Sequence, residues 1–476
     1  MNVLIINTNQ HNQPFPVMPL GACLVADALE RTGHRVQMLD FMFETNPISA
    51  LHHKLSGRHF DIVGLSIRNI DNNDMRSPRF FLQGLPHLVQ AIRELSEAKI
   101  VIGGAAMGVM PEEILRFSGA DYAVLGDGEY VMPELLSHIG SGDGVTTPGI
   151  AYIADGVFHS TARSTTTVSR GCMLPDFARW INVGAYLSRM STVPLQTKLG
   201  CRYKCVYCTY RKIEGDTYRL CEPECVVETL QKLVSKGLKD IEFVDNVFNS
   251  PYDHAMEICR LLKKRKHGAR LQSLELNPTF VDDALIDAME GAGFVGVGIT
   301  AESASDNVLR RLRKSFTLQD VHNAASVIKR HKLPCIWIFL LGGPGESRQT
   351  VAETFAFAER YVRPKDAVFF NIGVRVYPGT ELESIAREEG LLDLPPEDML
   401  RPVFYLSPDV EPEWLSERAG DFLKTHMNVI DSTSLELPFL PALHKIGHKM
   451  GMKPPLWRHM SAIRRFLQYT GIYTYR

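Results

Sequence analysis

Short apolar runs alternate with segments of helical periodicity over the first 140 residues. Short runs bounded by Gly, Asn or Asp are typical of buried strands, and apolar residues three and four apart are typical of amphipathic helices. The pattern predicts strands at 3–7, 35–39, 62–66, 100–104 and 122–125, and helices at 19–32, 87–95, 110–117 and 129–139. This alternation predicts an α/β domain with a doubly wound parallel sheet, in which ligands lie beyond the carboxyl ends of the strands.

A second alternating region follows a break in the rhythm. Residues 141–192 contain Gly, Ser and Thr clusters and two weak strands, which are typical of a linker or a small hairpin. Strands are then predicted at 196–198, 240–245, 273–276, 296–300, 336–341 and 367–374. About six strand–helix units in a row predict a full or partial (β/α)6 barrel whose catalytic loops follow the strands. The predicted parts are a sheet domain (1–140), a linker (141–192), the partial barrel (193–390) and a small, mainly helical, substrate-facing cap (391–476).

Composition narrows the class of protein. A net charge of −2 over 476 residues removes the case for a protein that binds nucleic acid by bulk charge. The first residues read as a strand and not as a signal peptide, and no window of roughly 18 apolar residues occurs, so we predict a cytoplasmic protein without a membrane span. In that compartment thiols stay reduced, and grouped cysteines bind metal more often than they form disulfides. Neither GxGxxG nor GxxxxGK[ST] occurs, so the phosphate cradles of dinucleotide and P-loop sites are missing.

Three of the nine cysteines, Cys201, Cys205 and Cys208, form a CxxxCxxC motif after the Gly200 turn. Three thiolates on one short loop suit one face of an iron–sulfur cluster and leave one iron open for a substrate or cofactor. A zinc site needs four ligands, and no second CxxC or HxxxH lies nearby. The remaining cysteines are interpreted as ordinary reduced thiols: Cys23, Cys172, Cys221, Cys225, Cys259 and Cys335.

The cysteine motif resembles the signature of the radical S-adenosylmethionine (SAM) superfamily. The resemblance implies a [4Fe–4S] cluster whose open iron is chelated by SAM, which is then cleaved to a 5′-deoxyadenosyl radical. Later segments at 242–249, 298–306, 339–346 and 375–380 resemble further motifs of the family in the same order, although Asp245-Asn246 replaces the usual GGE triplet. On this resemblance, contacts to SAM are expected from Tyr207, Asp245, Asn246, Glu302, Gly343, Arg375 and Tyr377.

The N-terminal region resembles the cobalamin-binding domains that are fused to radical SAM domains. Residues 18–34 resemble the entry segment of those domains, and 103–113 and 121–129 resemble their later loops. The DxHxxG motif that supplies a histidine to cobalt is absent, so the resemblance implies cobalamin bound without a histidine below the cobalt. Expected contacts to cobalamin are Asn7, Ser66, Arg68, Gly103, Gly104 and Glu129. The alternative is a vestigial domain that binds no corrin.

The combined resemblance implies methylation of an unactivated carbon of a small-molecule substrate, such as a secondary metabolite or a lipid. In such enzymes the adenosyl radical removes a hydrogen atom and methylcobalamin delivers the methyl group. An electron donor such as flavodoxin or ferredoxin is implied. The tail at 441–476 has seven Lys/Arg and no Asp/Glu, which is typical of a solvated surface helix and would also suit an anionic or carrier-bound substrate.

Three other functions use some of the same sequence features. The same cofactors would also serve ring formation, rearrangement or oxidation, which only the mass of the product separates. A methylthiotransferase is rejected because only Cys23 and Cys172 precede Cys201, and those enzymes carry three more cluster cysteines there. A non-catalytic cobalamin or redox sensor is disfavoured by the complete CxxxCxxC motif.

Overall fold

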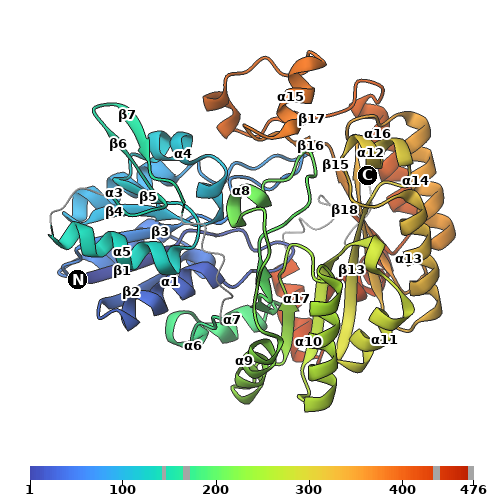
Figure 1. The fold of residues 1–476 in the computed structure, drawn as a ribbon, viewed down its shortest axis with the longest axis horizontal. Coiled ribbons are helices and arrows are strands. Elements are labelled where there is room, and N and C mark those ends of the chain that lie inside the picture. The colour runs from blue at the N-terminus through green and yellow to red at the C-terminus, as the bar shows by residue number, and fades with distance from the viewer. Residues whose placement is uncertain (142–145, 164–171, 432–439, 470–476) are drawn as a thin grey trace.

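The computed structural model of the chain describes residues 1–476 except 142–145, 164–171, 432–439 and 470–476, so parts of the predicted linker and cap lie outside the described residues (Figure 1). Two seven-stranded sheets, each covered by helices, organise the chain. Within the described residues, no helix combines the length and apolar character that crossing a membrane requires.

The first sheet has the strand order β2-β1-β3-β4-β5-β6-β7, and its first five strands are parallel. These strands are β1 (Asn2–Asn7), β2 (Arg35–Asp40), β3 (Ile62–Ser66), β4 (Lys99–Gly103) and β5 (Tyr122–Val124). The helices between them are α1 (Leu20–Arg31), α2 (Pro47–Leu55), α3 (Leu85–Leu95), α4 (Pro111–Ser118) and α5 (Gly128–Ser141). Helices α1 and α5 pack together, as do α3 and its neighbours α2 and α4. The predicted doubly wound sheet is confirmed, with helix α2 as an addition.

The hairpin β6 (Ile150–Ala154) and β7 (Val157–Ser160) belongs to this sheet and not to a free-standing linker. Strand β6 pairs antiparallel with β5, with Tyr122 opposite Tyr152. This pairing satisfies backbone groups of β5 that an open sheet edge would leave without partners. The hairpin is followed by the short helices α6 (Phe177–Trp180) and α7 (Val183–Leu187).

The second sheet is parallel throughout, in the order β18-β15-β14-β13-β12-β11-β8. Its strands are β8 (Val193–Leu195), β11 (Asp240–Phe243), β12 (Arg270–Leu276), β13 (Phe294–Glu302), β14 (Cys335–Leu341), β15 (Ala367–Ile372) and β18 (Val429–Asp431). Its helices are α8 (Tyr210–Glu214), α9 (Pro223–Ser235), α10 (Tyr252–Arg265), α11 (Asp283–Gly291), α12 (Asp306–Arg311), α13 (Leu318–Arg330), α14 (Arg348–Tyr361), α15 (Glu381–Glu388) and α16 (Pro412–Thr425). Six consecutive strand–helix units confirm the predicted partial barrel, and β18 adds a seventh strand.

Short strands and 3-10 helices complete the described chain. The strands are β9 (Lys198–Leu199) with β10 (Arg219–Leu220), and β16 (Val374–Arg375) with β17 (Phe404–Tyr405). The 3-10 helices are η1 (Phe41–Phe43), η2 (Ala105–Gly108), η3 (Pro278–Phe280), η4 (Pro396–Leu400) and η6 (Leu456–His459). The C-terminal helices are α17 (Leu440–Lys449) and α18 (Met460–Tyr469).

The C-terminal segment packs inside the barrel. In β14, Trp337 contacts Phe357 of α14 on the outer face, whereas Ile336 points to the other face and packs with Leu456 and Met460. A Cβ added at Gly296, near the start of β13, would lie 2.7 Å from the Trp457 ring. The segment therefore fills the interior near the amino-terminal ends of the strands. Apolar residues of the predicted cap are thus buried against the sheet, and its substrate-facing role stays a prediction.

Candidate functional site

The three motif cysteines lie on an irregular loop at the carboxyl end of the barrel. Gly200 turns the chain into this loop with a φ of +90°, and a Cβ there would lie 2.0 Å from the Thr217 carbonyl oxygen. The Cys201 amide donates to the Gly215 oxygen at 3.1 Å, and the Cys208 amide donates to the Cys205 oxygen at 3.2 Å. All three thiols are free, and Cys201 is buried. Burial raises the pKa of Cys208 to about 12, so iron must displace the thiol protons as it binds.

A buried ion pair holds the strand that leads into this loop. The Asp245 carboxylate accepts from the Thr197 amide at 2.7 Å and from the Lys198 ammonium at 3.2 Å. The Thr197 hydroxyl donates to the second oxygen of the same carboxylate. Both Asp245 oxygens are therefore already occupied, which suits a positioning role better than the expected contact with SAM. Neighbouring Asn246 donates to Glu214 at 2.6 Å.

A second buried group lies beside the cysteines. The Tyr207 hydroxyl donates to Glu302 Oε1 at 2.5 Å, and the Lys314 ammonium donates to the same oxygen at 3.0 Å. Glu302 ends β13 in the left-handed region, with a φ of +62°, a costly conformation for a residue with a side chain. Burial and the neighbouring Glu302 raise the pKa of Tyr207, and they raise the pKa of Glu275 on β12 to about 8. One cation, two carboxyl groups and a phenol thus surround the cluster loop.

Lys314 and Glu275 are residues that sequence reasoning missed. Lys314 is the last residue of the basic run 310–314, and such a run is typical of the solvent-exposed face of a helix. Glu275 stands in a strand pattern without any motif. Neither had a local signal, because only the tertiary fold carries them to the cysteine loop.

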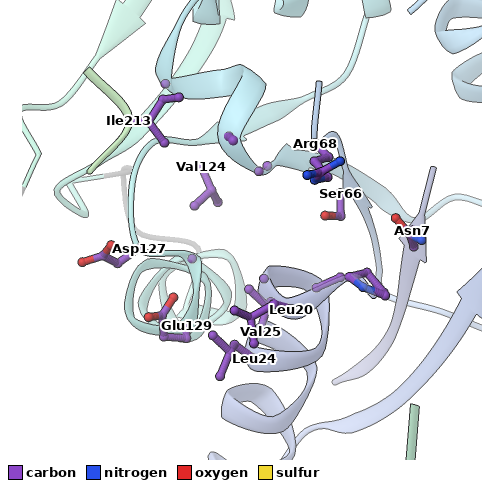
Figure 2. A pocket seen from close by; sticks show the side chains of 18 of the residues that line it. Asn7, Leu20, Leu24, Val25, Ser66, Arg68, Val124, Asp127, Glu129 and Ile213 are labelled. Atoms are coloured by element: carbon purple, nitrogen blue, oxygen red, sulfur yellow. The ribbon is translucent and has the colours of Figure 1, made fainter. Parts of the chain in front are cut away.

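A cavity of about 410 Å³ lies between the first sheet and the second half of the chain, beside helix α8 (Figure 2). All six expected cobalamin contacts line it: Asn7, Ser66, Arg68, Gly103, Gly104 and Glu129. They come from the carboxyl ends of β1, β3 and β4 and from the start of α5. The opposite wall includes Tyr210, Ile213 and Glu214 of helix α8, directly after the cysteine loop. The cavity therefore joins the two halves of the chain.

The lining of the cavity suits a large, mostly apolar ligand. Figure 2 shows Leu20, Leu24 and Val25 of α1 on one side, with Ser66 and Arg68 across from them. Several glycines also line the cavity and leave room for a ligand because they have no side chain, among them Gly64, Gly103, Gly104, Gly126 and Gly128. Burial lowers the pKa of Arg68, and nearby Tyr210 and Glu242 counteract this shift. The amide of Asn7 is already bonded to Asp40 at 2.7 Å.

Arg375 and Tyr377 form a strut between the two halves. The Arg375 guanidinium pairs with Asp71 of the first half at 2.7 Å and donates to the Met399 oxygen at 2.8 Å. The Tyr377 hydroxyl donates to Asn73 at 3.1 Å. The Arg375 side chain is thus saturated by the protein, which differs from its expected contact with the SAM carboxylate. Gly343, by contrast, lies in the turn after β14 against the Leu312 side chain.

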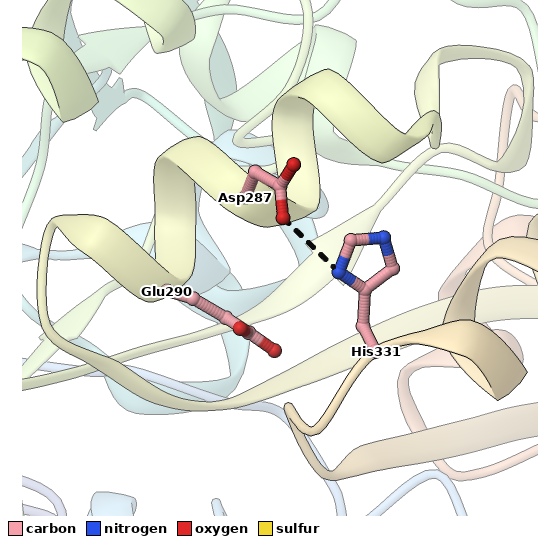
Figure 3. Close-up of side chains that lie close together, drawn as sticks. All are labelled: Asp287, Glu290 and His331. Atoms are coloured by element: carbon pink, nitrogen blue, oxygen red, sulfur yellow. Dashed lines mark ion pairs between the residues drawn. The ribbon is translucent and has the colours of Figure 1, made fainter.

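A separate group of acidic and imidazole side chains lies on the outside of the barrel (Figure 3). His331 is 3.4 Å from Asp287 and 2.9 Å from Asp283. Glu290 accepts the backbone amides of Lys332 and Leu333 at 3.0 and 2.8 Å. These bonds fasten the turn before β14 to helix α11, so the group has a structural explanation.

Comparison with known proteins identifies both halves. Residues 196–358 match the Radical SAM superfamily, and residues 11–136 match the B12 binding domain. The chain therefore contains a radical SAM domain and an N-terminal B12-binding domain, and the cofactors of these domains are a [4Fe–4S] cluster, SAM and cobalamin. The predicted family, fold and cofactors are thereby confirmed.

The similar proteins include methyltransferases and also an anaerobic magnesium-protoporphyrin IX monomethyl ester cyclase of Rubrivivax gelatinosus, 25% identical over 386 residues and covering 75% of this chain and 65% of that protein. The chain is 23% identical over 446 residues to a tryptophan 2-C-methyltransferase of Streptomyces laurentii, covering 79% of this chain and 73% of that protein. It is 24% identical over 470 residues to a cytidylyl-2-hydroxyethylphosphonate methyltransferase of Streptomyces wedmorensis, covering 85% and 84%. The solved structure of the radical SAM methyltransferase TsrM from Kitasatospora setae, with cobalamin and a [4Fe–4S] cluster bound, has a TM-score of 0.86 at 22% identity and covers 99% of both chains.

Proposed function

We propose that this enzyme transfers a methyl group to an unactivated carbon of a small-molecule substrate. The observation that supports the proposal is the shared cavity, whose lining includes the six expected cobalamin contacts and residues of helix α8, which follows the cysteine loop. Two similar proteins, the methyltransferases of tryptophan and of cytidylyl-2-hydroxyethylphosphonate, act on small molecules according to their names. A small electron-transfer protein such as flavodoxin or ferredoxin would supply the electrons.

The residues present fit the three cofactors chemically. Cys201, Cys205 and Cys208 offer thiol ligands for a [4Fe–4S] cluster on one loop. Glu302 and Lys314 offer a carboxylate and an ammonium beside that loop, which suit the amino and carboxylate groups of SAM. When bound, the cluster and SAM supply hydrogen-atom abstraction, and cobalamin supplies the methyl group.

The protein's own residues would orient and shield these groups. Glu302 and Tyr207 are held by one short hydrogen bond, so their side chains are already ordered before SAM arrives. The Asp71–Arg375 ion pair and the Tyr377–Asn73 bond join the two halves, which would hold the walls of the cavity at a fixed separation. A fixed cavity protects radicals from water and from side reactions.

Isotope labelling tests methyl transfer. Cells that express the enzyme with the biosynthetic genes beside it would receive methionine labelled in its methyl group. We expect one product that carries the label on carbon and is heavier than its precursor by one CH₂. A product of unchanged carbon count, with a new ring or a new oxidation state, would contradict methyl transfer and support ring formation or oxidation.

Cobalamin retention tests the first half of the cavity separately. Ser66→Phe places a ring at the carboxyl end of β3, where Ser66 lines the cavity. We expect hydroxocobalamin to co-elute with the wild-type chain in gel filtration and to be lost from Ser66→Phe. Ser160→Phe, on the exposed end of β7, is the matched control and should retain cobalamin. Elution of free cobalamin from the wild-type chain would support a vestigial domain.

A further inference from the structure

Three cysteines outside the CxxxCxxC loop come together in the fold. The Cys172 thiol lies near the thiols of Cys221 and Cys225, which raise its pKa together with burial. The Cys172 amide also donates to the Cys225 sulfur at 3.1 Å, although the two residues are 53 positions apart. Cys221 follows β10, and Cys225 is in the first turn of α9. Three separate segments thus supply one group of thiols, with Cys172 at its centre.

The arrangement does not suit a single metal ion. Among the described residues, the His, Cys, Asp and Glu side chains whose ligand atoms all lie within 4.8 Å of one another are Asp287, Glu290 and His331. The thiols of Cys172, Cys221 and Cys225 therefore do not surround one point. The contact between the Cys172 backbone and the Cys225 sulfur instead brings together two residues that can form a disulfide, with Cys221 nearby.

Cys172 is open to solvent through a surface hollow of about 620 Å³. Arg31, Lys232 and Lys236 line this hollow together with Asp27 and Asp176. Asp176 and Lys236 pair with each other at 2.9 Å, and Asp27 accepts from the Asp176 amide at 3.0 Å, so Arg31 and Lys232 together with Asp27 give the hollow a net charge of about +1. The hollow is therefore suited to a small molecule that carries negative charge.

The segment around Cys172, residues 172–180, bridges the two halves of the chain, and we call it the strap. Trp180 donates its indole N–H to Asp27 of α1 at 2.5 Å, and Arg179 pairs with Glu30 of α1 at 2.7 Å. On the other side, Lys236, directly after α9, pairs with Asp176 of the strap. A covalent bond between Cys172 and Cys225 would tie the strap, and through it α1, to α9.

We propose that Cys172 and Cys225 form a thiol–disulfide modification site that reacts with an anionic low-molecular-weight disulfide, of the class of oxidised glutathione. The Cys172 sulfur attacks the small disulfide, forms a mixed disulfide and releases one small thiol. The Cys225 sulfur then attacks the Cys172 sulfur, forms the intramolecular disulfide and releases the second small thiol. The two protein thiols are oxidised, their two protons leave on the two small thiols, and the small disulfide is reduced.

The position of Cys225 favours it as the resolving thiol over Cys221. Cys225 lies in the first turn of α9, and its sulfur accepts the Cys172 amide, which places it directly against the Cys172 backbone. The Cys221 sulfur is buried and faces the Gln196 carbonyl oxygen at 3.9 Å. This inference does not depend on methyl transfer, because neither thiol belongs to the predicted cofactor contacts.

Peptide mapping of the full-length chain with its cluster tests the proposal. The anaerobic protein would be treated with oxidised glutathione, quenched with acid, alkylated and digested without reductant. We expect a cross-linked peptide pair that contains Cys172 and Cys225, and its loss after dithiothreitol. Full alkylation of Cys172, a stable glutathione adduct on Cys172 without a cross-link, or a link to Cys221 in place of Cys225 would overturn the proposal.

Two variants control for general thiol oxidation. Cys172→Ser should abolish the cross-link, and Cys225→Ser should stop the reaction at the mixed disulfide on Cys172. Cys259→Ser changes a buried thiol in α10 and should leave the Cys172–Cys225 cross-link unchanged. A cross-link that persists in Cys172→Ser would overturn the assignment.

Discussion

The molecule contains two groups of three cysteines, and they differ in how the chain assembles them. Cys201, Cys205 and Cys208 share one short loop that no other segment interrupts. Cys172, Cys221 and Cys225 come from the strap, the end of β10 and helix α9. A site on one loop is readable from spacing, because the ligands are neighbours in sequence. A site built from distant segments becomes visible only in the fold.

The prediction with the largest expected effect is that iron binding needs the CxxxCxxC cysteines and does not need the second group of cysteines. Cys205→Ser removes a cluster ligand, so iron should fall from about four per chain to almost none, and SAM cleavage should be lost. Cys225→Ser is the matched control, because both residues are half-buried free thiols. It should keep the iron and the cleavage of SAM. Iron assays and chromatography of 5′-deoxyadenosine measure both.

Two outcomes would contradict the assignment of iron to the CxxxCxxC cysteines alone. Iron and SAM cleavage that survive in Cys205→Ser would remove the cluster from the CxxxCxxC loop. Iron lost equally from Cys225→Ser would place the second group in the cluster's own surroundings.

A smaller effect is expected on SAM affinity when Lys314 is changed, a residue that only the tertiary fold brings to the cysteine loop. Lys314 contributes the cation of the buried pair with Glu302, and its side chain is 8% exposed. Lys314→Met removes the proposed partner of the SAM carboxylate and leaves Glu302 without its counter-ion. We expect SAM to bind at least about tenfold more weakly, because truncating one member of a buried charge pair costs about 2–5 kcal/mol. Equilibrium binding of SAM to the iron-loaded protein measures this.

The control for this experiment is Lys424→Met, which removes a half-exposed lysine on α16. It should bind SAM normally, and both variants should keep their iron. Unchanged SAM affinity in Lys314→Met, with full iron content, would contradict the role assigned to Lys314.

The contrast between local and assembled features also explains how far the sequence could be interpreted. Periodicity predicted both parallel sheets, because each strand's apolar run is local. Periodicity did not predict that β18 pairs with β15, because nothing in residues 429–431 indicates which strand they lie beside. Spacing identified the cysteine loop, and strand ends identified the residues that line the cavity. Motif resemblance could not show that Asp245 and Arg375 are saturated by protein partners, because Lys198 and Asp71 are fixed only in three dimensions.

The six remaining cysteines show the same limit. Cys23, Cys259 and Cys335 are buried thiols, in agreement with the interpretation as ordinary reduced cysteines. Burial raises the pKa of Cys259 to about 12, which leaves it unreactive near neutral pH. The other three were given the same interpretation, and their convergence followed only from the placement of the strap.

The prediction with the smallest expected effect concerns Glu214, whose hydrogen bond to Gly200 holds the start of the cysteine loop. Glu214 of α8 accepts the Gly200 amide at 3.0 Å, directly before Cys201, and burial raises its pKa to about 7. A carboxyl group with a raised pKa favours the folded state when it is protonated. Its contribution to stability is therefore full below its unfolded pKa of about 4.3 and is lost as the pH rises through about 7.

Glu214→Gln stays neutral at every pH, so its stability should not fall over this interval. Thermal midpoints of the cluster-free wild type and variant, measured between pH 5 and 8, should diverge by a few degrees at most, with the variant gaining as pH rises. A constant difference across this range would show that Glu214 is charged throughout and that the loop rests on its other contacts.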